Sequence, residues 1–391
     1  MDYNKLINKS LLDIKPSGIR RFFDIAAEMK EVISLGIGEP DFFTPWHIRD
    51  AGIRSLETGH THYTANSGLQ ELREEISKYI YSRQGITYDP RSEILVTVGG
   101  SEALDLAIRS LVNCGDEVLI PEPAFVCYDP ITTIAGGIPV KIETKVENNF
   151  RLTARELKEA ITDKTKLLVL PYPNNPTGAV MRRRDLEEIA EVLRGTDIIV
   201  LSDEIYGELT YGDTPHVSIA SIEGMQEKTI VVNGFSKAYA MTGWRLGYIC
   251  APAPLTKAMT KLHQYAIMSS PTVSQYAAVE ALKNGDEDIE SMRQEYDRRR
   301  RLVVDGFRSI GLDCFEPEGA FYVFPCIRST GLSSEDFCEQ LLHSQHVAVI
   351  PGTAFGECGQ GFVRVSYCYS AKHLLEALDR IERFLKSLRG R

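Results

Sequence analysis

One lysine stands where an apolar strand is expected to end. Lys237 lies in the stretch NGFSKAYAMTGWRLGY, which runs from Asn233 to Tyr248 and overlaps the apolar run TIVVNGF. A lysine pushed into such a pocket has a lowered pKa, which suits it to form a Schiff base with an aldehyde. A salt-bridged lysine whose ammonium group reaches solvent is the commoner arrangement, so Lys237 alone does not define a site.

Two other charged side chains follow or interrupt apolar runs. Asp203 comes after DIIVLS, and Arg364 lies inside GFVRVSY. A buried carboxylate is costly unless it is paired, so Asp203 is expected to have a cationic partner, with a helix N-cap as the alternative. Arg364 needs an anion, and its planar guanidinium fits a carboxylate through two parallel hydrogen bonds. A structural ion pair is an equally open reading of Arg364.

Three polar segments complete this set. GGSEAL follows the run ILVTV and opens a helix, so its free backbone N–H groups can hold a phosphate, although glycines there are also typical of a tight turn. NNPTG follows LLVLPYP, and a plain turn explains its proline and glycine better than its paired asparagines. Tyr206 offers a phenol near Asp203. A phosphorylated aldehyde cofactor with a ring nitrogen, acting on an amino acid, requires this combination, which predicts pyridoxal 5′-phosphate (PLP).

These residues follow the strands of one expected sheet. From about residue 68, continuous apolar runs alternate with helical periodicity, which indicates a mainly parallel sheet covered on both faces. Ligands bind beyond the carboxyl ends of such strands. After about residue 285, a charged helix, shorter strands and an amphipathic C-terminal helix predict a smaller α+β domain. The expected strands are 94–98, 117–121, 167–173, 197–204, 229–235 and 246–252, and the expected helices are 69–83, one from Ser101, and 183–194.

Composition excludes several classes of protein. The chain has 391 residues and a formal net charge of −10, which argues against a nucleic-acid or anionic-membrane surface. The arginine run at 298–301 follows many acidic residues and is expected to be a solvated helix face. No GxGxxG motif supports a nicotinamide cofactor. The absence of a CxxC pair, an apolar leader and a membrane span predicts a cytoplasmic protein with free thiols, and no metal site is expected.

Nearly the whole chain also resembles a known family, the fold-type I, class I aminotransferases. It is most similar to the aspartate and aromatic aminotransferases of archaea and bacteria in subgroup Iγ. The motifs that carry this resemblance are SLGIGEPDFFTP, HYTANSGLQELREEI, GGSEAL, PEPAFVCY, NNPTGAV, SDEIY, NGFSKAYAMTGWRLGY, EGAFYVFP and PGTAFGECGQGFVRVSY.

The family's architecture implies the fold and the assembly. It implies an α/β fold, with a large domain built on a mainly parallel seven-stranded sheet and a smaller α+β domain. Residues 1–45 would form an N-terminal arm and part of the small domain, residues 46–285 the large PLP-binding domain, and residues 286–391 the small domain. The resemblance also implies a homodimer.

The resemblance assigns the cofactor residues. Lys237 corresponds to the Schiff-base lysine, and Asp203 would pair with the ring nitrogen. Asn175 and Tyr206 would bond the ring hydroxyl, while Phe125 would stack on the ring. The phosphate would be held by Gly100, Ser101, Ser236, Arg245 and, from a second subunit, Tyr63. Gly234 departs from relatives that have a serine at this position, so one phosphate hydrogen bond is expected to be missing.

The resemblance also implies the reaction. Gly38, Asn175 and Arg364 would receive the substrate's α-carboxylate, and Lys237 would move the Cα proton. The expected activity is ping-pong transfer of an amino group between an aromatic amino acid or aspartate and 2-oxoglutarate. Arg20 is the candidate for a second carboxylate. The alternatives are a PLP-dependent carbon–sulfur β-lyase and a non-catalytic PLP-sensing regulator, the latter disfavoured because the chain is acidic and starts at the family's arm.

Overall fold

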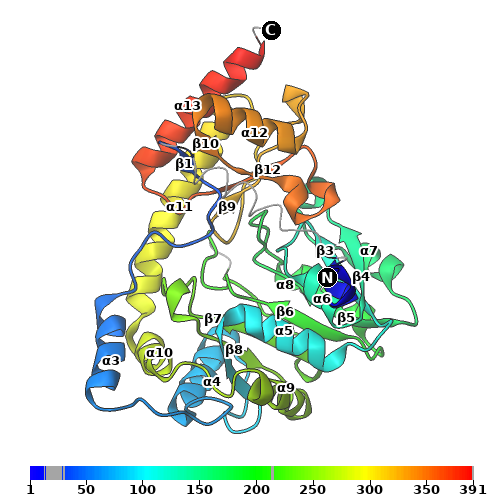
Figure 1. Cartoon of the computed structure of the whole chain (residues 1–391), viewed down its shortest axis with the longest axis vertical. Coiled ribbons are helices and arrows are strands. Elements are labelled where there is room, and N and C mark those ends of the chain that lie inside the picture. The colour runs from blue at the N-terminus through cyan, green and yellow to red at the C-terminus, as the bar shows by residue number, and fades with distance from the viewer. Residues whose placement is uncertain (13, 15–28, 30, 213–214, 390–391) are drawn as a thin grey trace.

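A seven-stranded sheet forms the centre of the larger part of the molecule (Figure 1). The computed structural model describes residues 1–391 apart from 13, 15–28, 30, 213–214 and 390–391. Within the described residues the strand order is β2-β8-β7-β6-β5-β3-β4, and only β8 runs antiparallel to its neighbours. This confirms the expected α/β fold and mainly parallel sheet. The strands are β2 (Ile94–Thr97), β3 (Glu117–Glu122), β4 (Ile138–Glu143), β5 (Thr165–Leu170), β6 (Ile199–Asp203), β7 (Thr229–Gly234) and β8 (Gly247–Cys250).

Two strands show the limits of the apolar-run criterion. A search for continuous apolar runs misses the edge strand β4, because most of its side chains are half-buried or exposed. All residues of β8 are buried, so its apolar run predicts a strand correctly, but burial carries no information about strand direction. The direction of β8 is therefore visible only in its pairing with β2 and β7.

Helices cover both faces of this sheet. In β5, Leu167 and Val169 pack into a cluster on one face, whereas Leu168 and Leu170 pack into a cluster on the other. This alternation follows from the two-residue period of a strand. The first face is covered by α5 (Gly99–Leu111), α6 (Tyr128–Ile134) and α9 (Ala253–Ala266), and the second by α4 (Gln70–Gln84), α7 (Ala154–Ala160), α8 (Arg183–Leu193) and α10 (Thr272–Asn284).

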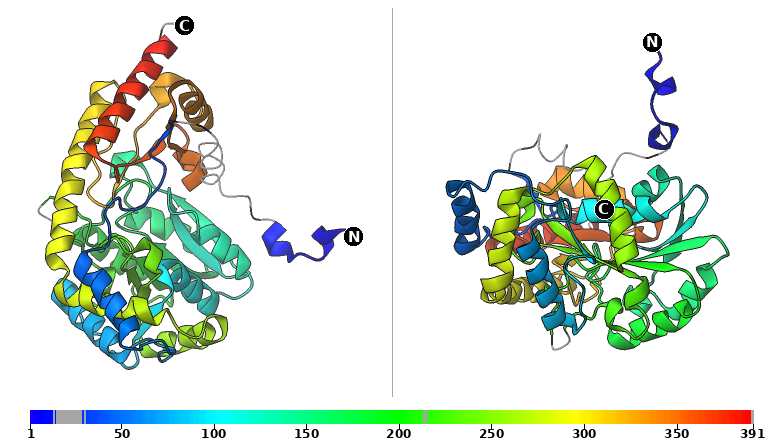
Figure 2. Two further views of the ribbon diagram at one scale, coloured as in Figure 1. Left: turned by 60° about the vertical axis from the view of Figure 1, so that its left-hand side comes forward. Right: turned by 90° about the horizontal axis from the view of Figure 1, so that it is seen from below.

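The upper part of the molecule in Figure 1 contains a three-stranded antiparallel sheet, ordered β11-β12-β9. Figure 2 shows the long helix α11 along one side, packed against α13. A short strand from the N-terminal segment, β1, pairs with β10 in this upper part. The elements are β1 (Ile33–Ser34), α11 (Asp286–Ser309), β9 (Tyr322–Val323), α12 (Ser334–Gln345), β10 (Val347–Ala348), β11 (Ile350–Pro351), β12 (Val363–Ser366) and α13 (Ala371–Arg389).

Two short helices near the N-terminus and the helix α3 lie before the seven-stranded sheet in the chain. The former, η1 (Tyr3–Lys5) and α1 (Lys9–Leu12), contain no buried residue, and α3 (Trp46–Glu57) packs against α10. Across the described ranges, no helix is long and apolar enough to cross a membrane. The eight cysteines are all free. The division of the chain at residues 45 and 285 stays a prediction.

Candidate active site

A cavity of about 420 Å³ lies beyond the carboxyl ends of β5, β6 and β7. Eleven residues singled out from the sequence line it: Gly38, Gly100, Ser101, Phe125, Asn175, Asp203, Tyr206, Ser236, Lys237, Arg245 and Arg364. Tyr63 does not line it and is 82% exposed in this single chain. Arg20 lies outside the described residues. The structure thus gathers side chains that are up to 326 positions apart, Gly38 and Arg364 being the extremes (364 − 38 = 326).

Lys237 enters the cavity from the segment after β7. Its Nζ donates a hydrogen bond to the carbonyl oxygen of Gly38 at 2.8 Å. The same atom lies 5.6 Å from the centroid of the Phe321 ring and 5.9 Å from that of Tyr206. Lys237 pairs with none of the described carboxylates, and burial lowers the pKa of its amine to about 8. An appreciable fraction of this amine is therefore uncharged near neutral pH, as a nucleophile or base must be.

Asp203 ends β6 and is almost fully buried. The Tyr128 hydroxyl donates to its Oδ2 at 2.7 Å, and the Ile205 amide donates to its Oδ1 at 3.2 Å. Burial raises the pKa of this carboxyl, and the two hydrogen bonds oppose that rise. The cationic partner expected from the sequence is not found among the described residues. Neutral donors hold the carboxylate, so its charge stays available to a cation in the cavity.

The start of α5 forms a cradle for an anion. The helix begins at Gly99 rather than at Ser101, and no side chain caps its first turn. A Cβ on Gly99, whose φ is +74°, would lie 2.6 Å from a guanidinium nitrogen of Arg245. Arg245 itself has a left-handed φ of +51° and donates to the Thr242 carbonyl at 3.1 Å. Uncapped N–H groups and a close guanidinium are the donors that a phosphate group requires.

The close approach of β7 and β8 explains why residue 234 is a glycine. It pairs with Gly247 of β8, and a Cβ on Gly234 would lie 3.0 Å from the Gly247 Cα and 3.0 Å from the Leu246 carbonyl oxygen. A serine here would therefore need the two strands to separate by a few tenths of an ångström. The close packing of β7 and β8 accounts for glycine at this position.

Arg364 lies on β12 and is 3% exposed. One terminal nitrogen donates to Asn175 Oδ1 at 2.9 Å, and the other donates to the Gly36 carbonyl. Its Nε is buried without a hydrogen-bond partner. The structural ion pair considered from the sequence does not occur with any carboxylate that the structure describes. A buried guanidinium that lines a cavity and has no carboxylate partner among the described residues can receive an anion, and its planar fork matches a carboxylate.

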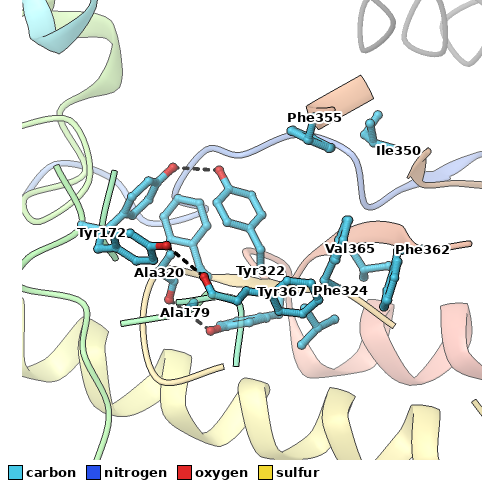
Figure 3. Close-up of a cluster of buried hydrophobic side chains, with 14 of the residues drawn as sticks. Tyr172, Ala179, Ala320, Tyr322, Phe324, Ile350, Phe355, Phe362, Val365 and Tyr367 are labelled. Carbon is cyan, nitrogen blue, oxygen red and sulfur yellow. Dashed lines mark hydrogen bonds between the residues drawn. The ribbon is translucent and has the colours of Figure 1, made fainter. Parts of the chain in front are cut away.

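Two tyrosines in the cavity wall have no role assigned from the sequence, although they lie in PEPAFVCY and EGAFYVFP, two of the motifs that carry the family resemblance. Tyr128, at the start of α6, binds Asp203 as described above. Tyr322, on β9, places its hydroxyl 2.8 Å from that of Tyr206 and its ring below the guanidinium of Arg364. Figure 3 shows Tyr322 among the buried side chains around β9 and β12. A buried tyrosine in an apolar run is typical of a core, so only its neighbours show its connection with the site.

Comparison with known proteins identifies the family of the chain. The family model "Aminotransferase class I and II" matches residues 30–381. A Bacillus subtilis (strain 168) protein described as an aminotransferase, YugH, is 55% identical over 95% of this chain and 96% of its own. The aspartate aminotransferase of Pyrococcus abyssi is 49% identical over 95% of this chain and 96% of its own. The structure of the aromatic aminotransferase from Pyrococcus horikoshii OT3 superposes with a TM-score of 0.90, at 48% identity, covering 94% of this chain and 99% of that one.

The family model and these relatives are all described as aminotransferases, enzymes that transfer amino groups. The chain belongs to the class I and II aminotransferases. The family membership expected from the motifs is thereby confirmed, and the protein is an aminotransferase.

Proposed function

We propose that this aminotransferase uses PLP to move an amino group between an L-amino acid and 2-oxoglutarate by a ping-pong mechanism. One observation carries the proposal. Lys237, Asp203 and Arg364 line one cavity with their side chains wholly or largely buried, yet none is paired with an opposite charge of the described chain. Uncompensated buried charges are costly, so an enclosed ligand with the complementary charges is expected.

The residues present fit PLP. The uncapped start of α5, Ser236 and Arg245 would hold its phosphate, and Asp203 would pair with its protonated ring nitrogen. Asn175 and Tyr206 would bond its ring hydroxyl, with Phe125 against the ring. Bound PLP supplies a ring that accepts the electron pair released when the substrate Cα loses its proton.

The chain's own groups would carry the proton. Lys237 Nζ, with its lowered pKa, would take the proton from the substrate Cα as general base and would then return it as general acid. Arg364 holds the α-carboxylate that every amino-acid substrate shares, and the Gly38 carbonyl accepts from the Lys237 amine. Asp203 would keep the cofactor's ring nitrogen protonated, because no cation of the described chain neutralises the Asp203 carboxylate.

The substrate side chain meets few charges in this cavity. Of the described cations that line it, Lys237, Arg245 and Arg364 already have roles in the proposal. Ile37, Phe125 and Tyr322 supply apolar surface, which suits an aromatic donor. A dicarboxylate needs a further cation, for which Arg20 stays the candidate. Relatives named aspartate and aromatic aminotransferases support both aspartate and aromatic amino acids as donors.

An exposed apolar surface supports a homodimer. Tyr63 lies between α3 and α4, and its loop is attached to the start of α10, where Thr272 Oγ1 donates to the His62 carbonyl at 2.8 Å. Exposed hydrophobic side chains on or next to α3, in this loop, and at or just after the end of α9 are Phe43, Trp46, Ile53, Leu56, Tyr63, Tyr265, Ile267 and Met268. A second copy on this surface would bury them and bring Tyr63 to its phosphate site.

A panel of amino donors with 2-oxoglutarate tests the reaction. Conversion of the loaded enzyme to its pyridoxamine form by phenylalanine, tyrosine or aspartate, reversed by 2-oxoglutarate, is the expected result. Release of pyruvate and ammonia from a cysteine conjugate, without a stable pyridoxamine form, would instead indicate a β-lyase.

Arg20→Ala tests the dicarboxylate site. Losing one partner of a buried ionic hydrogen bond costs roughly 2–5 kcal/mol. We therefore expect 2-oxoglutarate and aspartate to lose affinity strongly while phenylalanine is spared, as measured by half-reaction kinetics with each substrate. Equal losses for all three, or none, would remove Arg20 from the pocket.

A further inference from the structure

The side chain of Tyr322 contacts one residue proposed to bind the cofactor, Tyr206, and one proposed to bind the substrate, Arg364. Tyr322 of β9 pairs with Ser366 of β12, and Arg364 lies two residues before Ser366 on the same strand. Residues two apart on a strand share a face, so Tyr322 and Arg364 are diagonal neighbours on one side of this small sheet. The guanidinium carbon of Arg364 lies 4.5 Å from the centroid of the Tyr322 ring.

The opposite end of the Tyr322 ring reaches the large sheet. Its hydroxyl lies 2.8 Å from the hydroxyl of Tyr206. The hydroxyl also lies against the chain at Gly38, where a Cβ would be only 2.0 Å from the phenol oxygen. In Figure 3 the Tyr322 ring points away from the cluster of Phe324 and Tyr367, with its hydroxyl in a hydrogen bond at the far end.

Each phenol has only one proton to donate. Burial raises the pKa of Tyr322 to about 12 and that of Tyr206 well above its usual value, so both stay protonated at neutral pH. Tyr206 is proposed above to give its proton to the cofactor's ring oxygen. Its own oxygen can then only accept a hydrogen bond, and Tyr322 is the neighbour placed to donate one.

We propose that Tyr322 is a positioning residue with two separable functions: its hydroxyl directs the Tyr206 proton towards the cofactor's ring oxygen, and its ring supports the plane of Arg364 for the substrate carboxylate. The inference rests on the proposed use of PLP. Hydrogen bonds in a chain strengthen one another, so Tyr206 donates more strongly when Tyr322 donates to it. The ring of Phe355 lies on the guanidinium at 4.7 Å, so Arg364 is in contact with two aromatic faces and presents its edge to a ligand.

Three variants of the PLP-loaded enzyme separate these functions. Tyr322→Phe removes only the hydroxyl, and Tyr322→Leu removes both the hydroxyl and the ring. Tyr367→Phe is the matched control, because Tyr367 is equally buried and donates to the Ala320 carbonyl at 3.1 Å instead of to the cavity. The measurements are the pH midpoint of the visible absorbance change, the Kd of 3-phenylpropionate, which has a carboxylate and no amino group, and the Tm.

The proposed function of the Tyr322 hydroxyl is tested by the pH midpoint of the visible absorbance change. A donor to the ring oxygen stabilises the form with more negative charge on that oxygen, which is the form that has lost a proton. Weaker donation from Tyr206 therefore raises the midpoint, by about 0.4 to 1 pH unit for one hydrogen bond. We expect this rise in Tyr322→Phe and Tyr322→Leu, and not in Tyr367→Phe. An unchanged midpoint in Tyr322→Phe overturns the first function.

The ring is tested by carboxylate binding. We expect Tyr322→Leu to weaken 3-phenylpropionate about 3- to 30-fold, as loss of a desolvated cation–π contact implies, while Tyr322→Phe stays within about twofold of the parent. Equal affinity in all variants overturns the second function, and equal changes in Tyr367→Phe would show a merely structural effect. If the parent enzyme binds PLP but does not transaminate, the proposed function fails, while the midpoint and the Kd still report on Tyr322.

Discussion

Asp203 and Arg364 are both buried charged residues in one cavity, but the chain supports them differently. Asp203, at the end of a strand in the seven-stranded sheet, has both carboxylate oxygens bonded by neutral donors. Arg364, on the three-stranded sheet, has two neutral acceptors and two aromatic faces, and its Nε lacks a partner. Both oxygens of the acid are thus bonded by the chain, whereas the arginine keeps one nitrogen without an acceptor.

The segments that position Asp203 and Arg364 also differ. Everything that orients Asp203 comes from α6 and from the residues after β6, next to the large sheet. Arg364 depends on groups from three distant segments, namely Gly36, Asn175 and the strand β9. Changes near Asp203 should therefore affect the chemistry, and changes near Arg364 should affect substrate binding first.

The largest expected effect is that of Lys237→Ala. The proposed attachment to the cofactor and the proton transfer both need this amine, so transamination should be abolished while the fold is kept. Activity and the visible absorbance of the loaded protein measure the effect. Lys228→Ala is a matched control, because burial also lowers the pKa of Lys228 but its amine donates to the Leu193 and Thr196 carbonyls. Full turnover in Lys237→Ala would contradict the proposed role of Lys237 in cofactor attachment and proton transfer.

Asp203→Asn should come next. A neutral amide cannot hold a ring nitrogen in its protonated form, so we expect the rate to fall about 10³-fold, with only a modest loss of cofactor. Single-turnover kinetics and cofactor titration measure the two quantities. Glu204→Gln is the control for loss of a neighbouring buried carboxylate, because Glu204 binds Ser202, Ser218 and His216 and does not line the cavity. Near-normal kinetics in Asp203→Asn would limit Asp203 to a structural role.

Gly38→Ala should have a smaller effect, on the substrate side of the comparison. The new methyl group would meet the Tyr322 hydroxyl, and overpacking of this kind costs about 1–3 kcal/mol of stability unless the two groups move apart, which would displace the substrate side of the cavity. We expect KM to rise more than kcat falls. Adding Tyr322→Phe removes the closest contact and should recover part of the loss. No recovery in the double variant would show that the backbone at Gly38, rather than Tyr322, sets the limit.

The smallest effect concerns pH. The Lys237 pKa is lowered from 10.5 to about 8 in the ligand-free fold, so between these values the unfolded chain binds more protons than the folded one. Stability then rises with pH in this window, by at most about 1.4 kcal/mol per pH unit. Denaturant unfolding of the ligand-free protein at pH 8 and pH 9 should show this rise relative to Lys237→Met. A parallel change in both proteins would contradict the lowered pKa.

Much of the site follows from the order of residues along the chain. Asp203 and Lys237 each follow a strand that an apolar run reveals, and parallel strands bring their carboxyl ends to one edge of a sheet. Arg364 stands out because a charge inside an apolar run is unusual. Local pattern and the chemistry of side chains were sufficient to predict these residues and the mainly parallel sheet.

Contacts between distant segments are decided only by the tertiary structure. The partners of Asp203 and Arg364, the approach of Tyr322 to Gly38, the antiparallel direction of β8 and the edge strand β4 all depend on pairing across long stretches of chain. A buried tyrosine has the same apolar neighbours in sequence whether its hydroxyl meets a carbonyl, as in Tyr367, or a second phenol, as in Tyr322. Sequence determines which side chains are buried, and packing determines what each buried polar atom meets.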